Sequence, residues 1–250
     1  VLQQVDASFE LLIEDDGSTD NSHEIIGRIS DPRIHFVRRK ENIGACNTLN
    51  NLIQRSQGKY IAIINSDDVW LGTNKLAKQR EFLDSNNHIA ACFGRARYID
   101  NAGNTINKSS ILLGGIFDVS NISQSDWIRR FFDSGNCLCH PTIMIRRDAY
   151  KLTGLYDNRL RQIPDFDIWT NLIKHSEIYV AEDEMIEFRL IEGENTSAPT
   201  VKNSIRLMNE YEIVYEKFLD GIGVSLFQDA FGDIMAASKI QSEAHFEIEK

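Results

Sequence analysis

The sequence predicts an α/β domain with a mostly parallel central sheet and helices on its faces. Short apolar runs rich in β-branched residues, such as 33–37 and 60–64, are typical of buried strands and too short for helices. These runs alternate along the chain with segments of helical periodicity, as a parallel sheet requires. A chain of 250 residues with 42% hydrophobic content can also bury one substantial core.

The individual elements follow from apolar runs and the turns that end them. Strands are predicted over 9–14, 33–37, 60–64, 89–94, 96–100 and 141–146. Helices are predicted through Ile25 and Ile26, over 45–56, 74–85, 125–133 and 148–153, and from Asp165 onward. Asn101 to Asn104 form a predicted hairpin turn, and the Ser- and Gly-rich segment 107–123 is a predicted loop over the site.

Apolar residues recur near helical period after Val201. This region is therefore predicted to be a helical support rather than a catalytic part. The expected organisation is one domain over residues 1–198 and a helical C-terminal extension over residues 199–250.

Two adjacent carboxylates, Asp67 and Asp68, follow the strand predicted over 60–64. Open α/β sheets bind ligands at the carboxyl ends of their strands. Neighbouring carboxylates repel each other, so a divalent cation that holds a diphosphate would relieve them. This motif alone is equally consistent with a solvated turn that caps the strand.

A second acidic strand end lies upstream, where the strand over 9–14 runs into Asp15 and Asp16. The following residues 18–20 are read as helix-capping and turn residues. Between the two acidic strand ends, the basic stretch 38–40 and the turn at Gly44 precede a helix. Cationic side chains and a helix N-terminus at the same edge of the sheet suit a phosphate or a nucleotide.

In their order and spacing, these blocks resemble the family 2 glycosyltransferases. The matching segments are 15–20, 41–47 and 58–70, and the likeness continues in 135–147 and 165–169 before it fades near Pro199. The resemblance implies the GT-A fold and a metal-dependent, inverting transfer of one sugar from a nucleotide-diphosphate sugar to a hydroxyl group. It also implies a role in bacterial surface polysaccharide synthesis.

The resemblance assigns the catalytic base to Asp165. An inverting transfer needs one general base to take the proton of the acceptor hydroxyl. Read alone, a carboxylate in the first turn of a helix is more often a capping residue, and only its place in the family pattern favours the base. His140 is read as a core histidine rather than an acceptor contact.

The resemblance also implies the nucleotide contacts. Asp16 is expected to contact the base or ribose, with Asp15 as its alternate, and Asp67 the ribose or the metal. Lys40 and Asn42 are expected in the pyrimidine pocket, although a basic run is usually a solvated face.

The metal site implied by the resemblance consists of Asp67 and Asp68, with Mn²⁺ or Mg²⁺ as the ion. The chain departs from the family pattern at this site, because Asn65 stands where Asp is common. The late Arg-x-His motif that is common in the family is only partly present, because Arg189 is kept but the histidine is missing. A third protein ligand for the metal is therefore in doubt. Arg189 fits a phosphate contact and a salt bridge within the fold equally well.

Two further departures concern catalysis. Pro164 precedes Asp165 where the family usually has a glutamate, so a supporting carboxylate is missing. No Gln-x-x-Arg-Trp motif, which marks processive synthases of this family, follows Asp165. The main alternative is a degenerate domain that binds nucleotide-sugars or partner proteins without transfer. A nucleotidyltransferase lacks its Gly-rich loop here, and no G-x-G-x-x-G supports an oxidoreductase.

Charge and composition restrict the partners. The net charge of −10 argues against nucleic acid as a partner. The expected partners are a nucleotide-diphosphate sugar, with UDP-sugars favoured, and a saccharide or lipid-linked saccharide acceptor. No apolar run approaches the roughly 18 residues that span a bilayer. The expected location is the cytoplasm, either free or peripheral at the inner face of the membrane.

The start of the chain carries one more expectation. Residues 1–4 resemble the end of the family's first helix, so the family's first strand would lie before Val1. Without that strand, an apolar sheet edge would be left unpaired. A longer natural chain is therefore expected.

Overall fold

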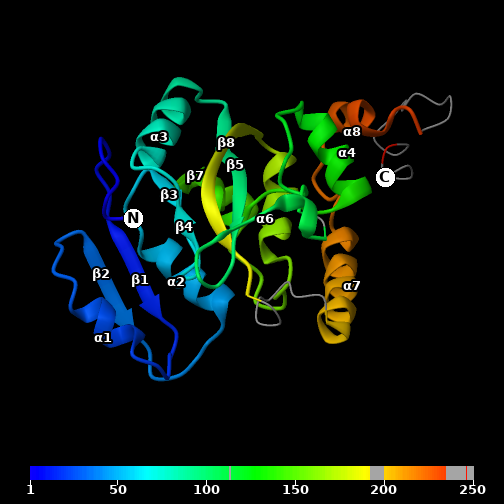
Figure 1. Cartoon of the computed structure of the whole chain (residues 1–250). Helices are drawn as coiled ribbons and strands as arrows, with labels where there is room; N and C mark the ends of the chain where they lie inside the picture. Colours follow the sequence, from blue (N-terminus) through cyan, green and yellow to red (C-terminus); the bar gives the residue numbers. More distant parts are fainter. Residues whose placement is uncertain (113, 192–199, 235–245, 247–250) are drawn as a thin grey trace.

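The computed structural model describes residues 1–112, 114–191, 200–234 and 246. Its strands form a two-stranded sheet, β1–β2, and a six-stranded sheet with the order β3-β7-β5-β8-β4 and with β6 beside β5. Helices flank both sheets, and α4, α7 and α8 gather on the side away from β1 and β2 (Figure 1). The prediction of an α/β fold is confirmed.

The small sheet brings an acidic strand end beside a basic one. β1 (Leu11–Asp15) pairs in parallel with β2 (Ile34–Arg38), and Asp15 lies opposite Arg38. The helix α1 (Ser22–Gly27) connects the two strands, and α2 (Ala45–Arg55) follows them. All four elements lie where the sequence pattern predicts them.

The large sheet has mixed strand directions, so the expectation of a mostly parallel sheet is wrong. β5 (Ile89–Ile99) and β8 (Glu177–Arg189) are parallel. The other pairings in this sheet are antiparallel and involve β3 (Tyr60–Ala62), β4 (Val69–Trp70), β6 (Thr105–Ile106) and β7 (Met144–Arg146). Antiparallel neighbours need only short connections, such as the predicted hairpin turn after β5.

The two long strands are the least well predicted elements. β8 was not predicted, because its apolar alternation is interrupted by the charged residues Glu182, Asp183 and Glu184. β5 is one strand where two were predicted, with register shifts on either side of Gly94 and Arg95. A side chain at Gly94 would clash with Met185 of β8, so this glycine allows the two strands to approach closely.

The main core includes buried side chains of α4 (Gln124–Ser134), α6 (Pro164–Ile173), α7 (Val201–Glu216) and α8 (Val224–Phe231). The helix α3 (Lys75–Ser85) packs into a second, smaller cluster through Leu76 and Leu83. Shorter elements are α5 (Tyr150–Thr153) and the 3₁₀ turns η1 (Lys108–Ser110), η2 (His140–Thr142) and η3 (Arg147–Ala149). None of the described helices is long and apolar enough to span a bilayer.

The described part of the C-terminal extension packs into the same core as the rest of the chain. Val214, Phe218, Phe227 and Phe231 are buried in one cluster with Trp127 and Phe166. The helical character predicted for this region is confirmed over the residues that the structure describes. The domain boundary near residue 198 stays a prediction.

An apolar cavity of about 470 Å³ separates the two sheets. It is lined mainly by residues 7–12 around β1 and 60–64 around β3, together with side chains of α2 and α3. Within the described residues, β1 pairs only with β2, and β3 pairs only with β7. The facing edges of β1 and β3 are thus unpaired, which is the arrangement expected for this sheet without a strand between them.

Candidate active site

The carboxyl end of β1 presents a buried carboxylate, Asp15. Its Oδ1 accepts a hydrogen bond from the Ser18 N–H at 2.8 Å, and its Oδ2 lies 3.8 Å from Nε of Arg38. Hydrogen bonds from Ser18 lower the pKa of Asp15, and the Arg38 charge adds to this effect. The buried Oδ2 accepts no hydrogen bond from any described residue. One oxygen of Asp15 therefore remains available to a ligand.

The next carboxylate, Asp16, binds the start of α2. Its two oxygens accept the backbone N–H groups of Ile43 at 2.8 Å and Gly44 at 2.9 Å. Gly17 has φ +81° and lies against the backbone of Asn42, so the two turns approach closely where only glycine fits. Asp16 thus binds N–H groups that lead into the N-terminus of α2.

Sequence analysis overlooked Glu14, whose side chain is fully buried at the same edge. It forms an ion pair with Arg39, and its Oε2 lies 3.6 Å from Nη1 of Arg55. Glu14 therefore connects the ends of β1, β2 and α2. In sequence it stands as the last residue of an apolar run, which gave no signal of this role.

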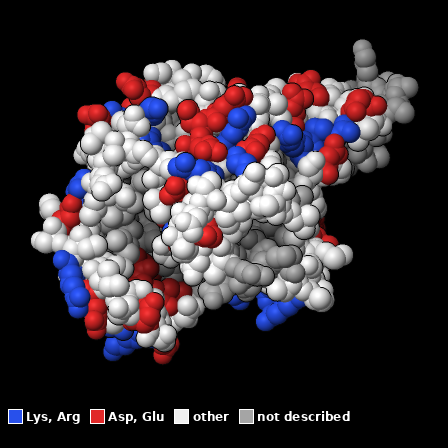
Figure 2. All heavy atoms as spheres, in the orientation of Figure 1, with Lys and Arg blue, Asp and Glu red and all other residues white. Residues whose placement is uncertain are grey.

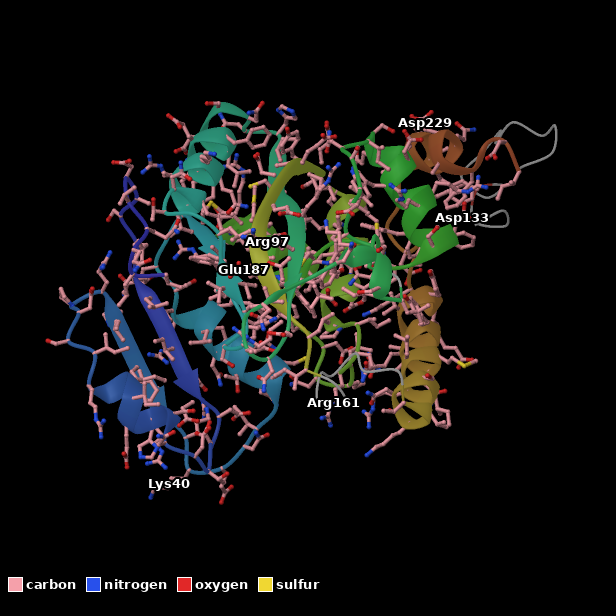
Figure 3. All side chains as sticks on the ribbon, viewed as in Figure 1. Lys40, Arg97, Asp133, Arg161, Glu187 and Asp229 are labelled. Carbon is pink, nitrogen blue, oxygen red and sulfur yellow. The ribbon has the colours of Figure 1, made fainter. Side chains whose placement is uncertain are left out.

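Lys40 and Asn42, predicted to line a pyrimidine pocket, are both exposed. Lys40 lies at the outer edge of the β1–β2 part and points away from the molecule (Figure 3). The Oδ1 of Asn42 accepts the Gly44 N–H at 3.1 Å. Asn42 is therefore next to the α2 N-terminus that Asp16 binds.

The second acidic turn joins β3 to β4 and contains Asp67 and Asp68. Asp68 is buried, and its oxygens accept hydrogen bonds from the Arg189 N–H at 2.9 Å and from Nδ2 of Asn65 at 3.0 Å. Burial raises the pKa of Asp68 to about 6, and the neighbouring Asp67 charge contributes to the rise. A bound cation would stabilise the ionised form of this carboxylate.

Arg189 holds this turn in place. Its Nε donates to the carbonyl of Asp67 at 2.8 Å, and its Nη1 donates to the carbonyls of Asp100 at 2.8 Å and Asn101 at 3.1 Å. These contacts clip the end of β8 to the acidic turn and to the hairpin after β5. Arg189 thus acts within the fold, through hydrogen bonds to backbone carbonyls.

Asp67 and Asp68 provide the type of ligand that a hard divalent cation prefers, but two side chains do not complete its coordination. Carboxylate oxygens are suitable ligands for Mn²⁺ or Mg²⁺. The described residues contain no group of three or more His, Cys, Asp or Glu side chains that could hold a metal ion. Any metal bound by these two aspartates would need further oxygens from a diphosphate or water.

Asp165 lies in the first turn of α6, as predicted, and is half-buried. Its Oδ2 accepts a hydrogen bond from Nδ2 of Asn136 at 2.8 Å. His140 lies near it, with its Nε2 2.8 Å from the Tyr156 hydroxyl and its ring 5.7 Å from that of Trp169. Burial lowers the pKa of His140, which agrees with its reading as a core histidine.

The causes of the raised pKa values of two cysteine thiols indicate which acidic residues lie near them. Burial raises the pKa of Cys139 well above its usual value, and the charges of Asp68 and Asp165 raise it further. Cys46, at the start of α2, has its pKa raised to about 11 by burial and by acidic neighbours that include Asp165. Asp165 and Asp68 are therefore both within electrostatic range of Cys139, and Asp165 is also within range of Cys46 at the start of α2.

Acidic side chains gather in a hollow of the surface beside the carboxyl end of β1 (Figure 2). Open α/β sheets bind their ligands at the carboxyl ends of their strands, and β1 ends in this region. The arrangement offers two chemical capacities: carboxylate oxygens for a cation, and a half-buried carboxylate, Asp165, that can accept a proton.

Comparison with proteins of known sequence identifies the family. Residues 1–153 match the model of glycosyl transferase family 2. TuaG of Bacillus subtilis, provisionally named a teichuronic acid biosynthesis glycosyltransferase, is 30% identical over 200 residues, which are 79% of this chain and 73% of TuaG. WfaP of Escherichia coli is 24% identical over 209 residues, with 83% and 76% covered. Its name describes a UDP-Glc:alpha-D-GlcNAc-diphosphoundecaprenol beta-1,3-glucosyltransferase.

Some relatives are considerably longer than this chain. An uncharacterized glycosyltransferase of Methanocaldococcus jannaschii is 25% identical over 188 residues, and the match spans 74% of this chain and 61% of that protein. A relative from Rickettsia felis is 30% identical over 215 residues, which are 84% of this chain but 33% of that protein.

Solved structures share the fold at low sequence identity. TarS 1–349 of S. aureus, in complex with UDP-GlcNAc, superposes with a TM-score of 0.62 at 15% identity, over 98% of this chain and 72% of that one. The mannosyltransferase PcManGT of Pyrobaculum calidifontis, in complex with GDP-Man and Mn²⁺, gives a TM-score of 0.57 at 12% identity, with 99% and 72% covered. The fold is that of the GT-A transferases, and the chain belongs to glycosyl transferase family 2.

Proposed function

We propose that this protein is a metal-dependent, inverting glycosyltransferase that moves one sugar from a UDP-sugar to a hydroxyl acceptor. The observation that carries the proposal is the placement of Asp165. Its carboxylate is half-buried, oriented by Asn136, and near the same buried thiol as Asp68. A proton acceptor close to a cation-binding turn is the arrangement that this transfer requires.

The donor would lie between β1 and the acidic turn that follows β3. Asp15, with one unpartnered buried oxygen, is the best placed of the proposed nucleotide contacts, followed by Asn42 at the start of α2. Asp16 would support the site by binding the backbone N–H groups of Ile43 and Gly44. Lys40 would affect the nucleotide only through its charge at long range. A UDP-sugar is favoured because a structural neighbour is described with UDP-GlcNAc and a relative is named for UDP-Glc.

Asp67 and Asp68 would hold Mn²⁺ or Mg²⁺, which when bound offsets the negative charge that develops on the departing diphosphate. Asp67 would also be close to the ribose. Arg189 would keep both aspartates in place, because its backbone N–H donates to the Asp68 carboxylate and its Nε donates to the Asp67 carbonyl. This role does not require Arg189 to contact a phosphate.

Asp165 would accept the proton of the acceptor hydroxyl as that oxygen bonds to the anomeric carbon. The bond from that carbon to the diphosphate oxygen breaks in the same step, so the configuration of the sugar inverts. Asn136 donates to one oxygen of Asp165, which leaves the other oxygen to receive the proton. The acceptor is proposed to be a saccharide or a lipid-linked saccharide of surface polysaccharide synthesis, in keeping with the names of TuaG and WfaP.

Calorimetric titration tests the proposal most simply. UDP, GDP and dTDP are each added to the protein with and without Mn²⁺, and the UDP titration is repeated on Asp68→Asn. We expect UDP to bind most tightly, to require Mn²⁺, and to bind more weakly to Asp68→Asn. If a folded protein binds none of the three nucleotides, the proposed function is wrong.

A second candidate is a degenerate domain that binds a nucleotide-sugar without transferring sugar. It is favoured by one observation: Asp16 and Asp68 already accept hydrogen bonds from backbone N–H groups within the fold. Tight, metal-dependent UDP binding without release of UDP from any sugar nucleotide, in the presence of saccharide acceptors, would identify this case.

A further inference from the structure

Pro164 stands directly before Asp165, where the family usually has a glutamate. A carboxylate from the distant helix α7 binds the segment that precedes Pro164. Glu210 of α7 is 2% exposed, and its carboxylate accepts three consecutive backbone N–H groups immediately before α6. The donors are Arg161 at 2.9 Å, Gln162 at 2.6 Å and Ile163 at 3.1 Å. Figure 3 places Arg161 between the central sheet and α7.

These hydrogen bonds meet a specific need of the chain around residue 164. α6 begins at Pro164, which has no N–H, and its N-cap residue Ile163 provides no side-chain cap. A carboxylate at a helix N-terminus stabilises the helix dipole and fixes the approach of the chain. A buried carboxylate, in turn, is retained only where donors such as these surround it. Glu210 therefore fixes the segment that leads directly into Asp165.

The next residue on α7, Tyr211, supports Asp165 from another direction. The Tyr211 hydroxyl lies against Gly135, the residue directly before Asn136. The side chain of Asn136 donates to Oδ2 of Asp165 at 2.8 Å. The Tyr211 ring also packs edge-on against Phe166, at 5.8 Å between ring centroids. Gly135, with φ +73°, leaves room for the hydroxyl, because a side chain there would clash with it.

We propose that Glu210 and Tyr211 are positioning residues that set the orientation of the Asp165 carboxylate. Glu210 fixes the backbone before Asp165. Tyr211 packs against Gly135 and Phe166, which are the sequence neighbours of Asn136 and Asp165. This inference rests on the proposed function, in which Asp165 is the base. It makes α7 part of the catalytic apparatus, although no residue of α7 is required to touch the substrate.

The test compares turnover with nucleotide binding in Glu210→Gln and Tyr211→Phe. UDP release from UDP-glucose is measured with a synthetic GlcNAc-diphospho-lipid acceptor, and UDP affinity is measured by calorimetry with Mn²⁺. A displacement of about 1 Å in a catalytic group can cost about 100-fold in rate. We expect kcat to fall roughly 10- to 100-fold in Glu210→Gln and several-fold in Tyr211→Phe, with UDP affinity changed by less than about twofold in both.

A double variant shows whether the effect passes through Asp165. Adding Glu210→Gln to Asp165→Asn should lower the remaining rate by less than about twofold, because the group being positioned is already lost. An additional fall as large as that of the single variant would overturn the proposal.

Two control variants separate positioning from general loss of stability. Glu212→Gln removes a charge from the exposed face of α7 and should leave kcat unchanged. Lys174→Met removes a buried ammonium that donates to the carbonyls of Lys217 at 2.9 Å and Asp220 at 3.0 Å. It should lower the melting temperature by loosening the C-terminal end of α7, with kcat again unchanged.

The outcomes distinguish this inference from the proposed function. If Asp165→Asn is inactive while Glu210→Gln and Tyr211→Phe keep wild-type kcat, the positioning role is wrong and the base assignment stands. A kcat loss in Lys174→Met equal to that in Glu210→Gln would also overturn the positioning role. An inactive wild type, or an active Asp165→Asn, would overturn the proposed function itself.

Discussion

The acidic turns near β1 and β3 differ from the start of α6 in how they are held. Asp16 fixes the turn around it through its own carboxylate, which accepts two backbone N–H groups. Asp68 also accepts a backbone N–H group, but Arg189 of β8 helps to hold its turn. Asp165 depends on other residues alone, with Asn136 on its side chain and Glu210 on the preceding backbone. The turn at Asp16 is thus self-supporting, the turn at Asp68 is supported in part by Arg189, and the proposed base is oriented from outside.

This difference suggests a division of roles. Binding a diphosphate and a cation tolerates adjustment, because water and ligand oxygens can complete the coordination. Proton transfer demands a fixed distance and angle between the base and the acceptor hydroxyl. A buried scaffold around Asp165 meets this demand, and α7 supplies part of that scaffold from the far end of the sequence.

The largest effect should come from Asp165→Asn, which removes the proposed base at the start of α6. An amide cannot take the acceptor proton, so kcat should fall by about 100-fold or more. The matched control is Asp167→Asn on the same helix, where Asp167 pairs with Lys217 at 2.8 Å. That variant should lose stability but keep most of its turnover. Equal turnover losses in the two variants would contradict the assignment of the base.

The next effect is a pH dependence that comes from Asp68. Its pKa is raised to about 6 in the folded protein, mainly by burial, against about 3.9 when unfolded. Below pH 4 both states are protonated. As the pH rises through 4 to 6 the unfolded state ionises first, so the free energy of unfolding falls, on the order of 2 kcal/mol in total.

The pH-dependent contribution of Asp68 to stability is measured by denaturant unfolding at pH 4, 5, 6 and 7. The metal-free wild type is compared with Asp68→Asn. The difference in unfolding free energy, wild type minus variant, should decrease up to about pH 6 and then level off. A difference that does not change with pH would show that the pKa of Asp68 is not raised.

A somewhat smaller effect is expected from Asp16→Ala, which tests the self-supporting turn. The change leaves the Ile43 N–H without its acceptor, whereas the Gly44 N–H keeps Asn42 Oδ1, so the free energy of unfolding should fall by about 1.5 kcal/mol. UDP affinity should fall as the start of α2 loosens, while kcat at saturating donor is kept. The exposed neighbour Glu41 provides a control, since Glu41→Ala should alter neither quantity. Loss of kcat without loss of stability in Asp16→Ala would refute this structural role.

The smallest effect is expected from Lys40→Ala. Lys40 is exposed and points away from the molecule, so only screened, long-range charge is lost. UDP affinity, measured by calorimetry at low and at physiological salt, should change by no more than about twofold. A tenfold loss that persists at high salt would show that Lys40 enters the nucleotide site, as the resemblance implied.

The sequence predicted the parts of the fold whose signals are local. The strand ends at Asp15 and Asp68 and the start of α6 at Asp165 were all found from short apolar runs and the turns that follow them. β8 was missed because its central residues 182–184 are charged, and its pairing with β5 depends on contacts between distant parts of the chain. Strand direction was predicted wrongly for the same reason.

The partners of the site residues could not be predicted. Nothing in the spacing of Asp16 and Gly44, or of Ile163 and Glu210, indicates that one carboxylate binds the other segment's backbone. From the sequence, Pro164 indicated only that a supporting carboxylate is missing before Asp165. Only the folded chain shows that this support comes from α7.

The central claim, that the acidic turns bind the donor while Asp165 acts on the acceptor, is tested most directly by titrating UDP in the presence of Mn²⁺ into Asp165→Asn and Asp68→Asn side by side. The account predicts that Asp165→Asn binds UDP within about twofold of the wild type, and that Asp68→Asn binds at least about tenfold more weakly, because it lacks a proposed metal ligand. Equal weakening in both variants, or wild-type affinity in Asp68→Asn, would contradict the account.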